Sequence, residues 1–300
     1  MSQTPLASLE GARKTFGKLN ALDGFDFAAN RGELTALLGP NGAGKSTAIS
    51  ILLGLQRADA GAAQLFGHDP QEIEGRRRIG VMMQEVALPT VMNPRELLEQ
   101  VASYYPTPYD PDEVMKRLSL ESLAKRRYGK LSGGQKRQVQ FALAIVGRPE
   151  LLFLDEPTVG LDVQAREALW QVVRDLRHEG CSIVLTTHYL EEAEALADRV
   201  VVMVRGRKVT SGTVDDIRSH VSRKQVSFIT RLAPESIRAW PGVLQLDTDR
   251  NRITLSTNDA EALLARLFRE DPGLEDIEVR RAGLAEAFSE ITAANQESLS

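Results

Sequence analysis

The sequence predicts an α/β protein with a mainly parallel sheet, followed by a smaller α+β domain. Short unbroken apolar runs alternate with helical patterns between residues 34 and 204, which is typical of parallel strands covered by helices. Strand patterns at residues 6–14 and 22–29 precede this alternation and indicate an added antiparallel β-layer. Beyond about residue 220 the strands cluster, so we expect one domain at residues 5–220 and a second at residues 221–294.

The composition is that of an ordinary globular protein, with 42% hydrophobic residues, 26% charged residues and a net charge of −4. This balance gives no reason to expect a nucleic-acid partner. No apolar run approaches the ~18–20 residues that cross a bilayer, and residues 1–9 lack the basic and apolar regions of a secretory signal. The single cysteine, Cys181, begins an apolar run, and we expect a buried thiol in a reducing cytoplasm.

The spacing of apolar residues assigns most elements of the chain. Apolar runs bounded by turn residues predict strands, and apolar residues three and four apart predict helices. We interpret residues 59–70 as a turn-rich loop and residues 294–300 as a frayed tail. Further strands are expected at residues 34–38, 79–83, 151–154, 183–185, 199–204, 226–231, 243–246, 252–256 and 274–280. Two helices are expected within residues 93–122, the first starting at Pro94 and the second containing Val114 and Leu118. Further helices are expected at residues 46–55, between 135 and 149, and at 169–176, 190–196, 260–268 and 284–291.

A glycine-rich loop between a predicted strand and a predicted helix is the strongest local signal. Two glycines separated by four residues and followed by Lys and Ser let backbone N–H groups turn onto phosphate oxygens at a helix N-terminus. Lys45 is expected to reach the β- and γ-phosphates from a solvent-facing position, and the Ser46 hydroxyl to bind Mg²⁺. The predicted nucleotide-binding loop consists of Gly39, Pro40, Asn41, Gly42, Ala43, Gly44, Lys45, Ser46 and Thr47.

A second group of polar residues follows the buried strand at residues 151–154. Asp155 would lie at the carboxyl edge of the sheet, where α/β proteins bind ligands, and is expected to hold the hydration shell of Mg²⁺. Glu156 is placed to polarise a water for attack on the γ-phosphate, a role worth ~10²–10⁴-fold in rate. An Asp-Glu-Pro turn alone is a common strand end, so this interpretation depends on the phosphate-binding loop upstream.

The ordered motifs resemble those of the ATP-binding-cassette (ABC) ATPases over about residues 5–220. The sequence Leu-Ser-Gly-Gly-Gln at residues 131–135 is similar to that family's signature and lies upstream of Asp155 and Glu156, as the family requires. The other landmarks are Gln84 after its strand, Gly160, Leu161 and Asp162 after Glu156, His188 after Thr187, and Phe16 where the family places an aromatic ring against adenine. The resemblance implies a P-loop NTPase fold of the ABC type, with a helical subdomain.

The resemblance also implies that ATP and Mg²⁺ bind between two copies of the chain packed head to tail. Glu156 would be the catalytic base. Each ATP would be held by the phosphate-binding loop of one copy and by the signature turn of the other, whose helix start offers a second anion site. The signature contacts would be Ser132, Gly133, Gly134 and Gln135, and the γ-phosphate would be contacted by Lys45 and His188. The metal would be held by Ser46, Gln84 and Asp155. Gln84 would also link the γ-phosphate to the partner, and Asp162 would support the subunit interface.

The C-terminal segment resembles the small domain of bacterial exporter ATPases of the drug-resistance type. Chains of that family often end in a helix with a Leu-Glu-Asp-x-Phe-like motif. Leu284, Glu286 and Phe288 keep the general form of this motif, whereas Ala285 and Ala287 depart from its acidic pattern. The resemblance implies a homodimeric ATPase at the cytoplasmic face of the membrane, beneath a separate transmembrane permease subunit that chooses the substrate.

Two other functions are compatible with such a cassette. Soluble ABC ATPases that act on ribosomes or DNA usually carry two cassettes or a long coiled coil, whereas this chain has one phosphate-binding loop and no sustained heptads. Importer ATPases tend to carry a longer β-rich tail than this one.

Overall fold

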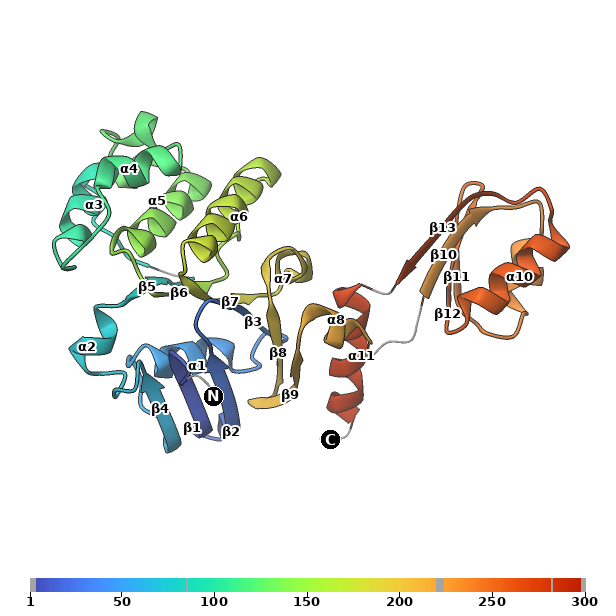
Figure 1. Ribbon diagram of the computed structural model, residues 1–300, viewed down its shortest axis with the longest axis horizontal. Coiled ribbons are helices and arrows are strands. Elements are labelled where there is room, and N and C mark those ends of the chain that lie inside the picture. Colours follow the sequence, from blue (N-terminus) through green and yellow to red (C-terminus); the bar gives the residue numbers. More distant parts are fainter. Residues whose placement is uncertain (1–3, 85, 220–223, 282, 298–300) are drawn as a thin grey trace. The chain divides into compact units, whose positions relative to one another are not determined.

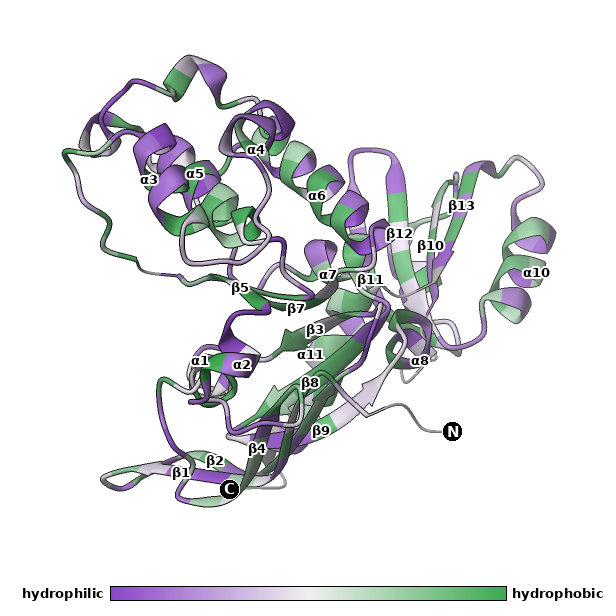
Figure 2. Cartoon of the chain, turned by 60° about the vertical axis from the view of Figure 1, so that its left-hand side comes forward, coloured by the Kyte–Doolittle hydropathy of each residue, from purple (hydrophilic) through white to green (hydrophobic). Residues whose placement is uncertain are grey.

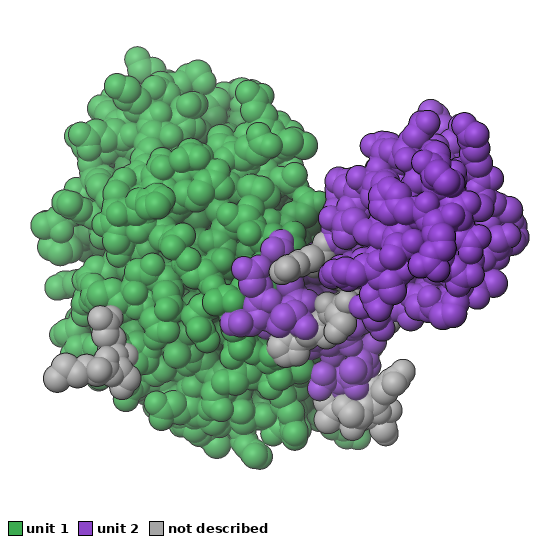
Figure 3. All heavy atoms as spheres, turned by 45° about the vertical axis from the view of Figure 1, so that its right-hand side comes forward, with its two compact units in different colours: residues 1–214, 299 green, residues 215–298, 300 purple. Residues whose placement is uncertain are grey.

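The structure is a computed structural model that describes residues 4–84, 86–219, 224–281 and 283–297. The chain divides into two compact units, one ending at Val214 and the other beginning at Asp215 (Figure 3). Each unit has its own sheets and its own core.

The first unit contains two sheets (Figure 1). A three-stranded antiparallel sheet has the order β2-β1-β4, and a six-stranded sheet has the order β5-β6-β7-β3-β8-β9, parallel except for its last pair. The strands are β1 (Ala7–Phe16), β2 (Leu19–Ala29), β3 (Leu34–Leu38), β4 (Ala60–Leu65), β5 (Ile79–Met82), β6 (Leu151–Asp155), β7 (Ser182–Thr187), β8 (Arg199–Val204) and β9 (Arg207–Gly212). The predicted mainly parallel sheet with an antiparallel β-layer is confirmed.

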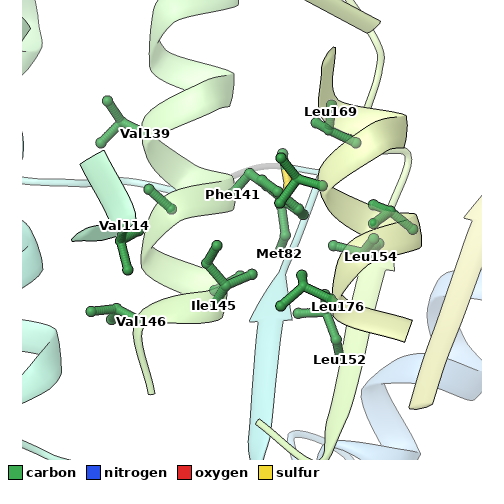
Figure 4. Close-up of a cluster of buried hydrophobic side chains, with 14 of the residues drawn as sticks. Met82, Val114, Val139, Phe141, Ile145, Val146, Leu152, Leu154, Leu169 and Leu176 are labelled. Carbon is green, nitrogen blue, oxygen red and sulfur yellow. The ribbon is translucent and has the colours of Figure 1, made fainter. Parts of the chain in front are cut away.

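Helices cover both faces of the central sheet. They are α1 (Lys45–Leu52), α2 (Ile73–Arg76), α3 (Pro94–Ala102), α4 (Pro111–Arg117), α5 (Gly133–Val146), α6 (Val163–His178) and α7 (Leu190–Leu196), with 3₁₀ turns at Glu121–Leu123 and Tyr128–Lys130. Apolar side chains of α1 pack with those of the antiparallel sheet and one face of the central sheet. Helices α3 to α6 form a second core with the other face (Figure 4).

Strand β6 shows why the central strands are apolar throughout. Leu151 and Phe153 point into the core with α1, whereas Leu152 and Leu154 point into the core with α5 and α6. A strand buried on both faces needs apolar residues at every position, which is the pattern of parallel sheets. Figure 2 shows the central strands in the colours of apolar residues, whereas the helices carry both colours.

One sequence expectation in this unit is wrong. The predicted loop at residues 59–70 contains β4, which pairs with β1 through Ala7 and Leu65. The helical pattern at residues 93–122 is two helices, as predicted, and each begins with a proline that follows a capping side chain, Asn93 or Asp110. These caps satisfy N–H groups that a helix start leaves free, so they fix where each helix begins.

The second unit contains a four-stranded antiparallel sheet with the order β11-β12-β10-β13. With its two helices this is the βαββαβ arrangement of ferredoxin-like domains. Apolar residues of α9 and α10 form its core with one face of the sheet. The elements are β10 (Lys224–Ile229), α9 (Pro234–Arg238), β11 (Val243–Asp249), β12 (Arg252–Thr257), α10 (Ala260–Glu270) and β13 (Glu275–Arg281), flanked by α8 (Val214–Ser219) and α11 (Leu284–Glu297).

Helix α11 differs from its sequence prediction at its end. The predicted frayed tail starts at residue 294, but the helix continues to Glu297. Asn295 donates a hydrogen bond from its side chain to the Ile291 carbonyl at 2.7 Å, which holds the last turn. Residues 298–300 lie outside the described residues.

Cys181 is buried, as the sequence predicts, and this burial raises the pKa of its thiol to about 12. Because the thiolate is the reactive form, we expect the native thiol to react with 5,5′-dithiobis(2-nitrobenzoate) at mildly alkaline pH at least ~10³-fold more slowly than an unfolded chain. The measurement is the rate of absorbance change with and without guanidinium chloride. Similar rates in the two conditions would contradict the burial.

Candidate functional site

The glycine-rich loop joins the end of β3 to the start of α1 and is held by its close surroundings. The Gly206 N–H donates to the Ala43 carbonyl at 2.8 Å, and the Ala43 N–H donates to the Pro40 carbonyl at 3.1 Å. A Cβ atom on Gly39 would lie 2.4 Å from the Met203 carbonyl oxygen, and one on Gly44 would lie 2.2 Å from that of Ala21. Both positions therefore need glycine because of close backbone packing.

The loop presents a helix N-terminus that no side chain caps. Gly44 takes the N-cap position with φ of 108°, and Gly42 has φ of 78° and open space where a side chain would stand. The first N–H groups of α1 and the open side of the loop fit a phosphate group. Ser46 is exposed beside them, and Thr47 is half-buried.

Lys45 is buried, so the predicted solvent-facing position is wrong. Its Nζ donates to the carbonyl oxygens of Gly39 at 2.7 Å and Pro40 at 3.2 Å, so the side chain connects the two ends of the loop. Burial lowers the pKa of Lys45, and the carboxylates of Glu156 and Asp155 oppose this shift. The ammonium is therefore held by carbonyls of the loop that carries it.

Asp155 ends β6 beside the adjacent strand β7, as the sequence predicts. It is 3% exposed, and its Oδ1 accepts a hydrogen bond from the Thr186 hydroxyl. Parallel strands deliver their last residues to one sheet edge, which brings this carboxylate near Lys45 at the end of the phosphate-binding loop.

Glu156 follows in an unusual backbone conformation, with φ of 52°. Its N–H donates to the Thr186 carbonyl at 3.0 Å, and its side chain is buried. His188 Nδ1 lies against Glu156 Oε2, an ion pair when the imidazole is protonated. Apart from His188, this oxygen has no hydrogen-bond partner in the described part of the chain, and a buried carboxylate oxygen of this kind fits a proton-accepting role.

The signature residues begin α5. The Ser132 Oγ accepts a hydrogen bond from the Gln135 N–H at 3.3 Å, and the Gln135 side chain accepts one from the Ser132 N–H at 3.1 Å. This capping box fixes the helix start, at which Ser132 and Gly133 are exposed.

Asp162 lies near the signature. It caps α6 by accepting a hydrogen bond from the Ala165 N–H at 2.8 Å. A cavity of about 680 Å³ is lined by Ser132, Gly134, Gln135, Gly160 and Asp162, together with residues of α5 and α6 and residues 117–119 at the end of α4. The phosphate-binding loop contributes no residue to this cavity, so the structure does not bring the two predicted phosphate sites together there.

Two further predicted residues lie on exposed segments. Phe16, the last residue of β1, is 46% exposed, and the Lys14 ammonium lies 5.7 Å from its ring centroid. Gln84 follows β5 with an exposed side chain. Its carbonyl accepts a hydrogen bond from Arg137 Nη1 at 2.9 Å.

Arg137 is a site residue that sequence reasoning missed. It lies in α5, is 7% exposed, and also donates to the carbonyls of Asp155 and Glu156. A usable signal was present, because Arg137 falls in helical register with Phe141, Ala144 and Ile145, all of them buried. A charged residue on an apolar helical stripe predicts a buried, hydrogen-bonded charge.

Comparison with known proteins identifies the family. The model for the ABC transporter family matches residues 22–159. The daunorubicin resistance ATP-binding protein DrrA3 of Streptomyces coeruleorubidus is 35% identical over 301 residues, covering 95% of each chain. The chain belongs to the ABC transporter family. This membership makes it an ATP-binding and ATP-hydrolysing protein.

Other ABC proteins resemble the chain in sequence or in structure. The doxorubicin resistance ATP-binding protein DrrA of Mycobacterium tuberculosis is 35% identical, covering 97% of this chain and 95% of the relative. The Nod factor export ATP-binding protein I of Ralstonia nicotianae is 38% identical over 73% of this chain and 71% of the relative. A solved ATP-binding subunit of an ABC transporter is 30% identical with a TM-score of 0.66, covering 72% of this chain and 92% of that one.

Proposed function

We propose that this ABC protein is the ATP-hydrolysing subunit of an exporter that works with a separate membrane subunit. Relatives that match nearly all of the chain are named for resistance to daunorubicin and doxorubicin, and another for Nod factor export. These names favour export over import and over a ribosome or DNA function. No helix in the described ranges is long and apolar enough to span a bilayer, so the proposal assigns the membrane path to another chain, against whose cytoplasmic side this subunit would bind.

The observation that carries the proposal is the meeting of Lys45, Asp155 and Glu156 at one edge of the central sheet. We assign Lys45 and the N–H groups of the loop to the β- and γ-phosphates of ATP. Ser46 and Asp155, with Gln84, would hold Mg²⁺, which neutralises phosphate charge when it is bound. The residues present fit this ion because an exposed hydroxyl and a buried carboxylate are hard oxygen ligands.

Glu156 is assigned as the base that accepts a proton from the attacking water. Its side chain is buried, and its Oε2 contacts His188 Nδ1 and has no further hydrogen-bond partner among the described residues. His188 would also contact the γ-phosphate. Phe16 would stack on the adenine ring, because its exposed face is free to pack against an aromatic base.

Two copies of the chain would complete each site. Ser132, Gly133, Gly134 and Gln135 form a second anion-binding helix start, and the cavity that they line contains no residue of the phosphate-binding loop. A head-to-tail homodimer supplies both phosphate sites to one ATP, with Asp162 near the contact between the subunits. ATP then links the subunits, and its hydrolysis releases them.

The test is the variant Ser132→Arg, which places a bulky cation where the partner's phosphates would lie. We expect each chain to bind ATP within about threefold of normal, since the phosphate-binding loop is unchanged, and ATP-dependent dimerisation to be lost. Light scattering on chromatographed protein measures the mass of a variant that also carries Glu156→Gln to prevent turnover. Ser236→Arg adds the same charge at an exposed position of α9 and should leave dimerisation intact.

Mixing two inactive variants tests the head-to-tail arrangement directly. A mixture of Lys45→Ala and Ser132→Arg chains can form a dimer with one complete site, so hydrolysis should return to a fraction of the normal rate. If each site were built within one chain, the mixture would be as inactive as its components, and the composite site would be wrong.

A further inference from the structure

Arg137 is the most heavily hydrogen-bonded buried charge near the site. Its guanidinium donates from Nη2 to the Asp155 carbonyl at 2.8 Å and to the Glu156 carbonyl, and from Nε to the Pro157 carbonyl at 3.3 Å. From Nη1 it donates to the Met83 and Gln84 carbonyls at 3.0 and 2.9 Å. All three nitrogens are engaged, and the acceptors on these two segments are backbone oxygens.

These acceptors lie where two neighbouring strands end. Strands β5 and β6 pair in parallel from Ile79 and Leu151 to Met82 and Leu154, and Arg137 binds the carbonyls that follow on both. Sheet hydrogen bonds stop at this edge, so buried carbonyls there need another donor. A guanidinium suits this position because its planar fork offers five N–H groups without an acceptor of its own.

The contact fixes the backbone on which Glu156 is carried. Glu156 has φ of 52°, a conformation that is rare for a residue with a side chain. The Glu156 N–H donates to the Thr186 carbonyl, and the Glu156 carbonyl accepts a hydrogen bond from Arg137. Both backbone polar groups of Glu156 are therefore hydrogen-bonded. The direction of the Glu156 side chain is therefore set from one side by β7 and from the other by Arg137.

The same guanidinium belongs to the helix that begins with the signature. Arg137 lies in α5 just beyond the capping box of Ser132 and Gln135. Gln140, a turn later, accepts from Arg137 Nη1 at 3.1 Å and donates to the Tyr128 hydroxyl at 3.0 Å. A displacement of α5 that makes or breaks a contact at the signature must therefore move the Arg137 guanidinium. This guanidinium holds the backbone carbonyls of both Glu156 and Gln84.

We propose that Arg137 is a positioning residue that holds Glu156 in its hydrolytic orientation and couples it to the signature end of α5. The inference rests on the proposed function, in which Glu156 is the base and Ser132 binds the partner's nucleotide. It also links the two ATP sites of a dimer, because the α5 that contacts one ATP orients the base for the other. Burial lowers the pKa of Arg137, and the nearby carboxylates of Asp155 and Glu156 oppose this shift.

The test is Arg137→Lys in the full chain, which keeps the charge but offers a single ammonium that cannot bridge two segments. We expect kcat for ATP to fall about 10–100-fold while KM and the affinity for ATP stay within about threefold, because none of the hydrogen bonds described for Arg137 goes to the phosphate-binding loop. The matched control is Arg177→Lys in α6. Arg177 is a half-buried arginine that pairs with Asp198, and its variant should keep kcat within about twofold. An unchanged kcat for Arg137→Lys would overturn the proposal.

A double-mutant cycle with Glu156→Gln separates positioning from a general structural role. If Arg137 acts through Glu156, then adding Arg137→Lys to Glu156→Gln costs less than about threefold further in single-turnover rate. A loss equal to that of Arg137→Lys alone would show independent action and overturn the proposal. Glu156→Gln alone tests the assignment of the base, so the failure of that assignment is distinguishable from the failure of the coupling.

Gln140→Met provides a second variant if Arg137→Lys does not fold. It removes the one side-chain acceptor that the guanidinium has among the described residues and leaves its backbone contacts in place. The expected result is a kcat lower by about 3–10-fold with unchanged KM, and the same non-additivity with Glu156→Gln. A normal kcat, or a loss that adds fully to that of Glu156→Gln, would contradict the positioning role.

Discussion

Lys45→Ala is expected to lose ATP hydrolysis by about 10²–10³-fold or more, with a large loss of ATP affinity, while the chain stays folded. The reason is that Lys45 is the ammonium group fixed at the phosphate-binding loop, and no other lysine is among the residues that line it. ATP affinity is measured by fluorescence of a labelled nucleotide, and turnover by phosphate release with Mg²⁺.

The buried position of Lys45 adds a second expectation for the same variant. Its Nζ binds the Gly39 and Pro40 carbonyls, so the substitution leaves them without this donor and costs the nucleotide-free chain about 1–3 kcal/mol. The thermal midpoint should fall by a few degrees with an unchanged circular dichroism spectrum. Lys208→Ala, on the exposed face of β9, is the control for loss of a lysine. Unchanged turnover in Lys45→Ala would remove it from the site.

Glu156→Gln is expected to bind ATP within a few-fold of normal, to hydrolyse it about 10²–10⁴-fold more slowly, and to accumulate as a dimer with ATP and Mg²⁺. The amide keeps the size of the side chain but cannot accept a proton from water. The Glu156 backbone is fixed by Thr186 and Arg137, so the substitution changes chemistry more than position. Light scattering after size-exclusion chromatography, with and without ATP, measures the dimer.

Glu150→Gln is the matched control for this prediction. Glu150 precedes the first residue of β6, the same strand whose other end leads to Glu156, and it pairs with Arg78 and Arg31 away from the site. It should change turnover by less than about twofold. A Glu156→Gln chain that stays monomeric would contradict ATP-driven pairing of the isolated subunit. A dimer that persists without ATP would assign the contact to the segment beyond residue 220.

The phosphate-binding loop and the Asp155 turn could be predicted because each is a local pattern with a fixed chemical use. Glycines, a lysine and a hydroxyl between a strand and a helix leave few alternatives, and the apolar strand at residues 151–154 delivers Asp155 to a known edge. Strand β4 could not be predicted in the same way. Its residues Ala60–Leu65 are mostly small and exposed, and it is a strand because β1 offers it backbone partners.

The positions of Lys45 and Arg137 depend on segments far away in the sequence. Lys45 turns back onto loop carbonyls, a choice that the motif alone does not reveal. Arg137 binds carbonyls at the ends of two strands, from 54 residues before it at Met83 to 20 residues after it at Pro157. Sequence spacing predicts the groups that would bind phosphate, but it does not show that the buried Arg137 holds the turn after β6.

The βαββαβ module of the second unit begins and ends at one place. Lys224 opens β10 and Arg281 closes β13, and these two residues face each other as partners in adjacent strands. Neighbouring antiparallel strands lie about 5 Å apart, so the two ends of the module are close enough to be joined by a short link. Evolution could therefore insert, exchange or delete this module between α8 and α11 as a self-contained piece, without altering the residues that hydrolyse ATP.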